Sequence, residues 1–239
     1  MHDIQKVVLI TGGSSGIGKA TAKRLLTDPQ VAVTIAGRSV ERLEAALSEL
    51  TPPADTFHAV QADVTNPLDV ERLVGSTLRR FGRIDVLINS AGVGAIGPFL
   101  EVDNASMEQL WKVNVLGTML LTQAVLPHMI EQKQGLIVNL AGILGIKTIP
   151  NAALYCATKH AVIGFSNALL QEVKRHNIRI TNICCSGVDT PFWNALSGKP
   201  RTELLLKPEE VAETIYQILM QPPHLITNQV LLQHSAHQL

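Results

Sequence analysis

The chain opens with a buried-strand pattern that runs directly into a glycine-rich turn, and this arrangement constrains the fold more than any other stretch. Residues 6–11 are apolar and β-branched, and Gly12, Gly16 and Gly18 follow before a helical pattern over residues 19–26. Glycines at such a turn let the backbone approach a phosphate group at the helix N-terminus. A plain strand-to-helix turn is the alternative, but the position at the first strand favours dinucleotide binding.

Strand and helix patterns alternate along the whole chain, without a linker, an internal repeat or a low-complexity tract. This alternation predicts one doubly wound, Rossmann-like α/β domain over residues 1–239, with a parallel sheet, right-handed crossovers and helices on both faces. A short segment at about residues 190–207 is expected to cover the substrate. Strands are predicted at residues 6–11, 31–36, 57–61, 84–88, 136–140, 178–184 and 229–232. Helices are predicted at residues 19–26, 40–50, 67–81, 106–129, 151–175 and 207–220.

Composition argues against several classes of protein. Hydrophobic residues make up 46% of the chain and charged residues 17%, with a formal net charge of zero. We therefore expect a well-buried globular protein that does not bind nucleic acid. No apolar run has the length of a membrane span, and the first strand begins too early for a signal peptide, so a cytoplasmic protein without a membrane partner is expected. Cys156, Cys184 and Cys185 have no metal-ligand spacing, so no metal site is predicted.

Residues at the ends of the predicted strands suit other parts of a dinucleotide. Arg38 follows the second strand, where an acidic residue would accept hydrogen bonds from a ribose 2′-hydroxyl. A guanidinium there favours a 2′-phosphate, and the Ser14 hydroxyl is a further donor, so NADP(H) is expected rather than NAD(H). An exposed arginine that merely starts the next helix is the alternative. Asp63 suits an adenine amino group, and the small residues at 89–92 would let a cofactor lie across the sheet edge.

A long helix is predicted over residues 151–175, entered through Pro150 with Asn151 as its N-cap. Tyr155 and Lys159 are four residues apart on it, so their side chains share a face. A nearby ammonium favours the phenolate and is expected to lower the pKa of Tyr155 from about 10. Taken alone, the pair would be read as surface residues of an ordinary helix. The order of the upstream motifs favours an acid–base role.

Asn114 lies near the middle of the helix predicted over residues 106–129. An asparagine is slightly unfavourable inside a helix. A solvated polar residue is the simple interpretation, and a kink or a bound water is the functional one.

In order and spacing these motifs resemble the short-chain dehydrogenase/reductase family in its shorter, single-domain form, over nearly the whole chain. They are T-G-x-x-x-G-x-G at residues 11–18, Asp63, N-x-A-G at residues 89–92, Asn114 and Y-x-x-x-K at residues 155–159. The resemblance implies hydride transfer between a nicotinamide and a small or medium carbonyl or alcohol. It makes Tyr155 the proton donor or acceptor, Lys159 the residue that binds the nicotinamide ribose, and Asn114 the anchor of a proton-relay water.

The resemblance also implies cofactor contacts and an assembly. Val188 and Thr190 fit the positions that hold the nicotinamide carboxamide in the family. The equivalent long helices pair between subunits there, so a homodimer or homotetramer is implied, and Ala157, Ala161 and Gly164 would allow close packing. The implied cofactor-binding residues are Gly12, Ser14, Ser15, Gly16, Ile17, Gly18, Arg38, Asp63, Val64, Asn89, Ala91, Gly92, Tyr155, Lys159, Val188 and Thr190.

Three positions depart from the family pattern. Gly142 stands where the family usually has a serine whose hydroxyl binds the substrate oxygen, and its neighbour is Ala141. Losing such a donor typically costs about 2.7–4 kcal/mol of transition-state stabilisation. A Pro-Gly pair expected near the nicotinamide reads Cys185 and Ser186, and Ser90 replaces a second asparagine.

Four explanations of Gly142 stay open. Another hydroxyl, from Thr148, Ser186 or the substrate, fills the role; a bound water occupies the space; the chain is a deliberately altered variant; or the protein binds cofactor without useful turnover. The leading hypothesis is an NADP(H)-dependent oxidoreductase, because Tyr155, Lys159 and Asn114 are all present. The alternative is a cofactor-binding protein with weak or lost catalysis that serves as a sensor or partner subunit.

Overall fold

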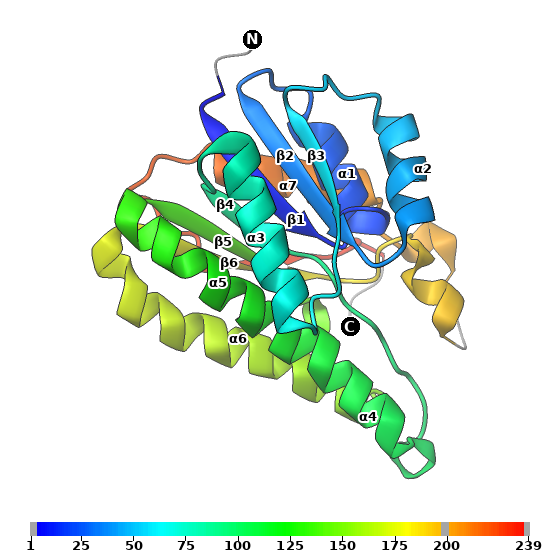
Figure 1. The fold of residues 1–239 in the computed structure, drawn as a ribbon. Helices are drawn as coiled ribbons and strands as arrows, with labels where there is room; N and C mark the ends of the chain where they lie inside the picture. Colours follow the sequence, from blue (N-terminus) through cyan, green and yellow to red (C-terminus); the bar gives the residue numbers. More distant parts are fainter. Residues whose placement is uncertain (1–3, 197–200, 237–239) are drawn as a thin grey trace.

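A seven-stranded parallel sheet forms the centre of the computed structural model, which describes residues 4–196 and 201–236 (Figure 1). The strand order is β3-β2-β1-β4-β5-β6-β7, so the chain changes direction across the sheet between β1 and β4. Ligands of open parallel sheets bind at such a switch point. The strands are β1 (Lys6–Thr11), β2 (Val31–Gly37), β3 (Phe57–Gln61), β4 (Val86–Asn89), β5 (Gly135–Leu140), β6 (Ile178–Cys185) and β7 (Gln229–Leu232).

Helices cover both faces of the sheet, as the alternation of patterns predicts (Figure 1). On one face lie α1 (Gly16–Leu25), α2 (Val40–Leu50) and α7 (Pro208–Leu219). On the other lie α3 (Pro67–Phe81), α5 (Gly117–Gln132) and α6 (Ala153–Val173), while α4 (Asn104–Leu110) extends away from the sheet. Short 3₁₀ helices are η1 (Phe99–Glu101), η3 (Ile143–Gly145), η4 (Lys174–His176), η5 (Pro191–Ala195) and η6 (Thr202–Leu204).

The central strands are continuous apolar runs because both of their faces are covered. In β1, Val8 and Ile10 pack toward α1 and α7, whereas Leu9 packs toward α3 and α5, and all three side chains are fully buried. The strand ends are therefore held rigidly, and the loops that follow them start from fixed positions.

Two helices differ from the sequence prediction in ways that affect the site. The single helix predicted over residues 106–129 is instead α4, a π-helical segment η2 (Trp111–Leu116) and α5. Asn114 lies inside η2, and π-helical segments are frequent at functional sites. The prediction that Asn151 is an N-cap is wrong, because Ala152 is the N-cap of α6 and Asn151 has a φ of +62° in the turn before it.

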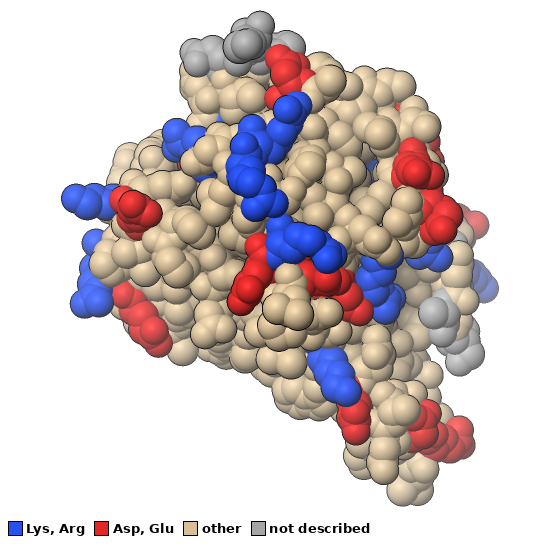
Figure 2. Space-filling model, viewed as in Figure 1, with Lys and Arg blue, Asp and Glu red and all other residues tan. Residues whose placement is uncertain are grey.

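Charged side chains of both signs are interspersed on the face seen in Figure 2, with wide uncharged areas between them. Asp69 pairs with Arg72 on α3 at 2.8 Å, and Glu108 pairs with Lys112 at 2.8 Å. An exposed pair such as Glu108 and Lys112 contributes about 0–1 kcal/mol. The fold is stabilised mainly by burial of apolar side chains between the sheet and the helices on its two faces.

The run Asn104–Gln132 is long and apolar enough to cross a membrane by length and composition alone, with a hydropathy of 1.4. Half of its most apolar window is buried inside the protein. Core helices of globular proteins pass the same criterion, so this feature is weak support for a membrane span.

Candidate functional site

The glycine-rich turn between β1 and α1 closes tightly against its neighbours. Gly12 has a φ of +66°, and a β-carbon placed on it would lie 2.9 Å from the Ala91 nitrogen. A β-carbon on Gly18 would lie 2.4 Å from the Gly12 carbonyl oxygen, and one on Gly16 would lie 3.1 Å from Thr190 Cγ2. Only glycine fits these approaches, and the resulting cradle at the N-terminus of α1 suits a pyrophosphate.

Two flanking positions of the same turn are placed by the fold. Ser15 is the N-cap residue of α1, with no side-chain hydrogen bond to the helix. Ile17 packs against the core on the α1 and α7 face. The Ala91 nitrogen donates to Thr11 Oγ1 at 3.3 Å, which joins the N-x-A-G turn to the end of β1.

Ser14 lies beside the end of β2, and Arg38 is the first residue after that strand. A β-carbon on Gly37 would lie 3.0 Å from Ser14 Oγ, which places this hydroxyl beside the residue that precedes Arg38. The Arg38 side chain is exposed and forms no ion pair with any residue that the structure describes. Its carbonyl oxygen accepts a hydrogen bond from Gln61 Nε2 at 3.0 Å. A guanidinium without an ion-pair partner and a hydroxyl beside the preceding residue are groups that suit a phosphate.

Asp63 and Val64 follow β3 and lie next to α5. Asp63 Oδ1 accepts hydrogen bonds from the Thr65 nitrogen at 2.9 Å and from Thr65 Oγ1 at 2.8 Å. This anchors the carboxylate through one oxygen. A β-carbon on Gly117 would lie 2.7 Å from Val64 Cγ2, so the helix packs closely on this strand end.

Tyr155, Lys159 and Asn114 converge beside Gly92. Lys159 Nζ lies 5.6 Å from the centroid of the Tyr155 ring and donates to the Leu140 carbonyl oxygen at 2.8 Å. A β-carbon on Gly92 would lie 3.4 Å from Asn114 Oδ1 and 3.7 Å from Lys159 Nζ. The fold thus brings the three predicted catalytic residues together at the switch point of the sheet.

The Asn114 side chain clamps the loop that follows β4. Its Oδ1 accepts from the Val93 nitrogen at 2.9 Å, and its Nδ2 donates to the Val93 carbonyl oxygen at 2.9 Å. Nδ2 also reaches Thr158 Oγ1 at 3.2 Å, and that hydroxyl donates to the Tyr155 carbonyl oxygen at 2.8 Å. The sequence did not predict this clamp, whose only visible signal is a polar residue at a buried helical position.

Burial dominates the protonation of the Tyr155 and Lys159 pair. Burial raises the pKa of the Tyr155 phenol, and it lowers the pKa of the Lys159 ammonium to about 8. The expectation that Lys159 lowers the pKa of Tyr155 is therefore wrong for this structure, because desolvation of the phenol is the largest influence on its pKa and raises it. Near neutral pH the phenol keeps its proton and is placed to donate it.

Gly142 adopts a backbone conformation that serine takes only with strain. Its φ is +68° and its ψ is 165°, a region occupied almost only by glycine. Its nitrogen donates to the Ile183 carbonyl oxygen at 2.9 Å, and a β-carbon on it would have only the Cys185 carbonyl oxygen nearby, at 3.9 Å. Glycine at this position allows the backbone conformation of the loop after β5 and leaves open the space that a side chain would occupy.

The two hydroxyls considered as substitutes for the missing serine differ in their surroundings. Thr148 is exposed. Ser186 is 4% exposed, and its Oγ has no hydrogen-bond partner in the part of the chain that the structure describes. Burying an unpaired hydroxyl is unfavourable. Ser186 is therefore the better placed of the two to gain a partner when a ligand binds.

An aromatic residue of η5 covers Tyr155. The rings of Phe192 and Tyr155 are 5.9 Å apart, and Trp193 meets Phe192 edge-on at 5.6 Å. Trp193 Nε1 donates to the carbonyl oxygen of Val188, which is buried and bridges to Leu206. Phe192 and Trp193 belong to the substrate-covering segment predicted at about residues 190–207, of which residues 197–200 lie outside the described residues.

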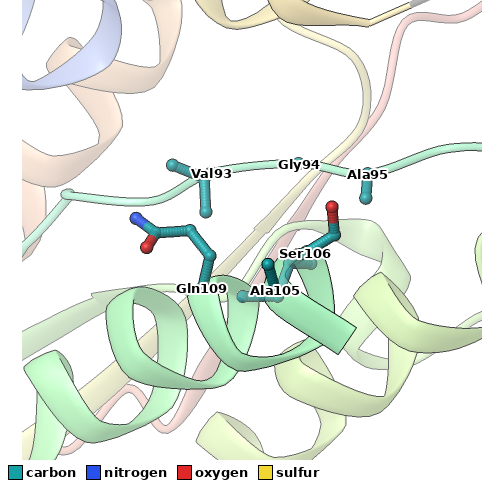
Figure 3. Close-up of a pocket in the computed structure, with 7 residues that line it drawn as sticks. Val93, Gly94, Ala95, Ala105, Ser106 and Gln109 are labelled. Atoms are coloured by element: carbon teal, nitrogen blue, oxygen red, sulfur yellow. The ribbon is translucent and has the colours of Figure 1, made fainter. Parts of the chain in front are cut away.

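A cavity of about 360 Å³ adjoins the loop that Asn114 clamps. Residues 93–95 form one wall, and Ser106 and Gln109 point toward them from α4 (Figure 3). A β-carbon on Gly94 would lie 2.4 Å from Phe192 Cζ, so the same loop contacts the aromatic cover.

No group of three or more His, Cys, Asp or Glu residues within residues 4–196 and 201–236 could hold a metal ion. Cys156, Cys184 and Cys185 are all buried and free.

A family model described as short chain dehydrogenase matches residues 6–200. The chain belongs to the short-chain dehydrogenase family. An uncharacterised oxidoreductase of Staphylococcus haemolyticus is 36% identical over 225 residues, covering 94% of this chain and 95% of that protein. The family match and its oxidoreductase relatives identify the chain as an enzyme of this class and confirm the family resemblance.

Solved structures of the family confirm the predicted fold class. The chain is similar to a 3-ketoacyl-(acyl-carrier-protein) reductase from Brucella melitensis complexed with NADH, with a TM-score of 0.89, 30% identity and coverage of 97% and 98% of the two chains. It is also similar to an alcohol dehydrogenase from Thermococcus sibiricus complexed with 5-hydroxy-NADP, with a TM-score of 0.87, 28% identity and coverage of 98% of both chains.

Proposed function

We propose that this protein is an NADP(H)-dependent oxidoreductase that transfers hydride between a nicotinamide and a small or medium carbonyl or alcohol. The convergence of Tyr155, Lys159 and Asn114 beside Gly92 carries the proposal. The cradle of glycines at the start of α1 lies at the same sheet edge and fits a dinucleotide. The oxidoreductase relatives support the reaction class.

The chain supplies position and protons for this reaction. A bound nicotinamide supplies the hydride. In the reduction direction the neutral Tyr155 phenol donates its proton to the substrate oxygen as negative charge develops there. The Lys159 ammonium binds the ribose hydroxyls and stabilises the phenolate that remains, and its pKa of about 8 suits it to return a proton.

The preference for NADP(H) rests on Arg38 and Ser14. The unpaired guanidinium and the neighbouring hydroxyl would bind a 2′-phosphate, and no acidic residue stands at this position to bind a 2′-hydroxyl. The structural neighbours include one complex with 5-hydroxy-NADP and one with NADH, so they support a nicotinamide cofactor of either kind.

A second candidate function is cofactor binding with weak or lost catalysis, in a sensor or a partner subunit. Gly142 favours it, because the hydroxyl expected to bind the substrate oxygen is missing there. The two candidates share the cofactor and differ in turnover.

We further propose a cytoplasmic homodimer or homotetramer that pairs through α5 and α6. Ala157, Gly164 and Ala168 are exposed on α6, and a β-carbon on Gly164 would meet nothing within 4 Å. On the adjoining helical run, Trp111 and Leu116 are 43% and 44% exposed. Light scattering would then give a multiple of the 25.9 kDa chain mass, and Gly164→Arg would lower the measured mass.

Oxidation of NADPH and of NADH over a panel of aldehydes, ketones and diketones tests the proposed function. We expect turnover with at least one carbonyl and a lower KM for NADPH than for NADH. Binding of NADPH without turnover on any member of the panel would favour the second candidate.

A further inference from the structure

A row of polar side chains crosses the sheet at one level. Thr11, Asn89, Asn139 and Asn182 are register neighbours on β1, β4, β5 and β6, and each is between 1% and 5% exposed. They lie on the face covered by α3, α5 and α6, where the surrounding core consists of aliphatic side chains. Burying an amide in such a core is unfavourable unless its hydrogen bonds are satisfied. The burial of these asparagines in an apolar core therefore indicates that their hydrogen bonds have a role.

Two of the asparagines form a continuous chain of hydrogen bonds with the catalytic helix. Asn89 Nδ2 donates to Asn139 Oδ1 at 2.8 Å, and Asn139 Nδ2 donates to Ser166 Oγ at 2.8 Å. The Ser166 hydroxyl donates to the Val162 carbonyl oxygen at 2.7 Å and is 1% exposed. The chain thus runs from the end of β4, through β5, into α6.

This chain joins the two parts of the candidate site. Asn89 is the first residue of the N-x-A-G turn that contains Gly92. Ser166 lies about two turns after Lys159 on α6, so the two side chains share a face. Lys159 Nζ bonds the carbonyl of Leu140, the residue after Asn139, so β5 holds α6 through adjacent residues.

We propose that Asn139 is a positioning residue. Through Asn89 and Ser166 it fixes the height and rotation of α6 against the N-x-A-G turn, and with them the placement of Tyr155 and Lys159. Aliphatic packing is non-directional, whereas these hydrogen bonds hold only one register. The inference rests on the proposed function, which gives Tyr155 and Lys159 their roles.

Loss of this chain of hydrogen bonds should change the geometry of the site. A misplacement of about 1 Å caused by a change far from the chemistry can cost about 10²-fold in rate. A contact that served only stability would lower the Tm and leave the rate of the folded enzyme unchanged.

Asn182 offers a matched control in the same row. It is 1% exposed, as is Asn139, and it is the register partner of Asn139 on β6. Its Oδ1 has no hydrogen-bond partner among the residues described. Asn182→Leu thus removes a buried amide of the same row without breaking the path from Asn89 to Ser166.

The experiment compares Asn139→Leu, Ser166→Ala and Asn182→Leu by kcat, pH profile, NADPH dissociation constant and Tm, with NADPH and the best carbonyl of the panel. We expect Asn139→Leu to lower kcat by roughly 10- to 100-fold and to shift the pH at which activity falls, while the NADPH dissociation constant changes far less. Ser166→Ala should act in the same direction, and Asn182→Leu should stay within about twofold of the native kcat.

Ser166→Thr keeps the hydroxyl and should retain activity that Ser166→Ala loses, which covers the case in which Asn139→Leu does not fold. Native kcat and pH profile in both Asn139→Leu and Ser166→Ala would overturn the inference, as would equal losses in Ser166→Thr and Ser166→Ala. Tyr155→Phe distinguishes failure of the positioning role from failure of the proposed function. If it abolishes turnover while the Asn139 and Ser166 variants keep theirs, only the positioning role fails; if it has no effect, the proposed function fails.

Discussion

The ring of Phe192 lies 5.9 Å from the ring of Tyr155, with the two planes inclined at 47°. Phe192 also contacts the loop after β4 at Gly94, and Trp193 meets its ring edge-on. We therefore expect Phe192 to limit the space that a substrate has next to the Tyr155 phenol.

Phe192→Ala should widen this space and change substrate selection. We expect kcat/KM for bulky ketones to rise relative to that for small aldehydes, because the removed ring no longer occupies the volume beside Tyr155. Steady-state kinetics with one carbonyl of each size measures the ratio. Phe99→Ala, which truncates a ring that is 57% exposed on η1, is the control and should leave the ratio unchanged. An equal ratio in native enzyme and Phe192→Ala would contradict the assigned cover.

Replacing Gly142 with serine should not give a more active enzyme. Because Gly142 has a φ of +68°, Gly142→Ser and Gly142→Ala should each cost about 1–3 kcal/mol of stability, a Tm loss of several degrees. Gly82→Ala is the control for backbone strain alone, since Gly82 also has a positive φ and a β-carbon on it would meet nothing within 4 Å. Thermal unfolding and kcat are measured together. A serine variant that is both as stable as the native protein and faster would show that the site lacks only a hydroxyl.

Removal of the Arg38 guanidinium should weaken NADPH binding selectively. Hydrogen bonds to charged groups contribute about 1.5–3 kcal/mol, so Arg38→Ala should raise the KM for NADPH by roughly 10- to 100-fold. The KM for NADH should change little, because NADH has no 2′-phosphate. Arg79→Ala, in the last turn of α3, is the matched control. Equal changes for the two cofactors would contradict a 2′-phosphate site at Arg38.

The lowered pKa of Lys159 predicts two effects of pH. Carbonyl reduction should decline as pH rises through about 8, because the ammonium that stabilises the Tyr155 phenolate loses its proton there. The contribution of Lys159 to folding stability should rise between about pH 8 and the ordinary lysine pKa, since the unfolded chain then binds more protons at Lys159 than the folded chain does. The buried thiols of Cys184 and Cys185 have raised pKa values and act in the opposite direction at higher pH, so the contribution of Lys159 is read from the difference between native protein and Lys159→Met. Chemical denaturation at several pH values measures this difference, and a difference that does not change with pH would contradict the lowered pKa of Lys159.

Local patterns were sufficient to predict the fold, because each strand carries its own apolar run and each helix its own periodicity. The shared face of Tyr155 and Lys159 followed from their spacing on one helix, whereas the role of Asn114 beside them was implied only by the family resemblance. A kink at Asn114 was one of the interpretations of its helical position, but the clamp between Asn114 and Val93 was not predictable, because it joins segments far apart in the sequence.

Other features of the site depend on contacts that a sequence does not display. The positive φ of Gly142 follows from the path of the loop after β5, and the raised pKa of Tyr155 follows from burial by distant residues. The link between Asn139 and Ser166 requires the order of the strands and the rotation of α6. A buried asparagine in a strand and a serine two turns after Lys159 were its only sequence signals.

The most direct measurement of the central claim is the comparison of native enzyme and Tyr155→Phe in NADPH-dependent carbonyl reduction, with NADPH binding followed by fluorescence. The substitution removes one oxygen and leaves the ring that packs against Phe192. If Tyr155 is the proton donor, binding stays close to native while turnover falls by about 10²-fold or more. A Tyr155→Phe enzyme that reduces the carbonyl at the native rate would contradict the account.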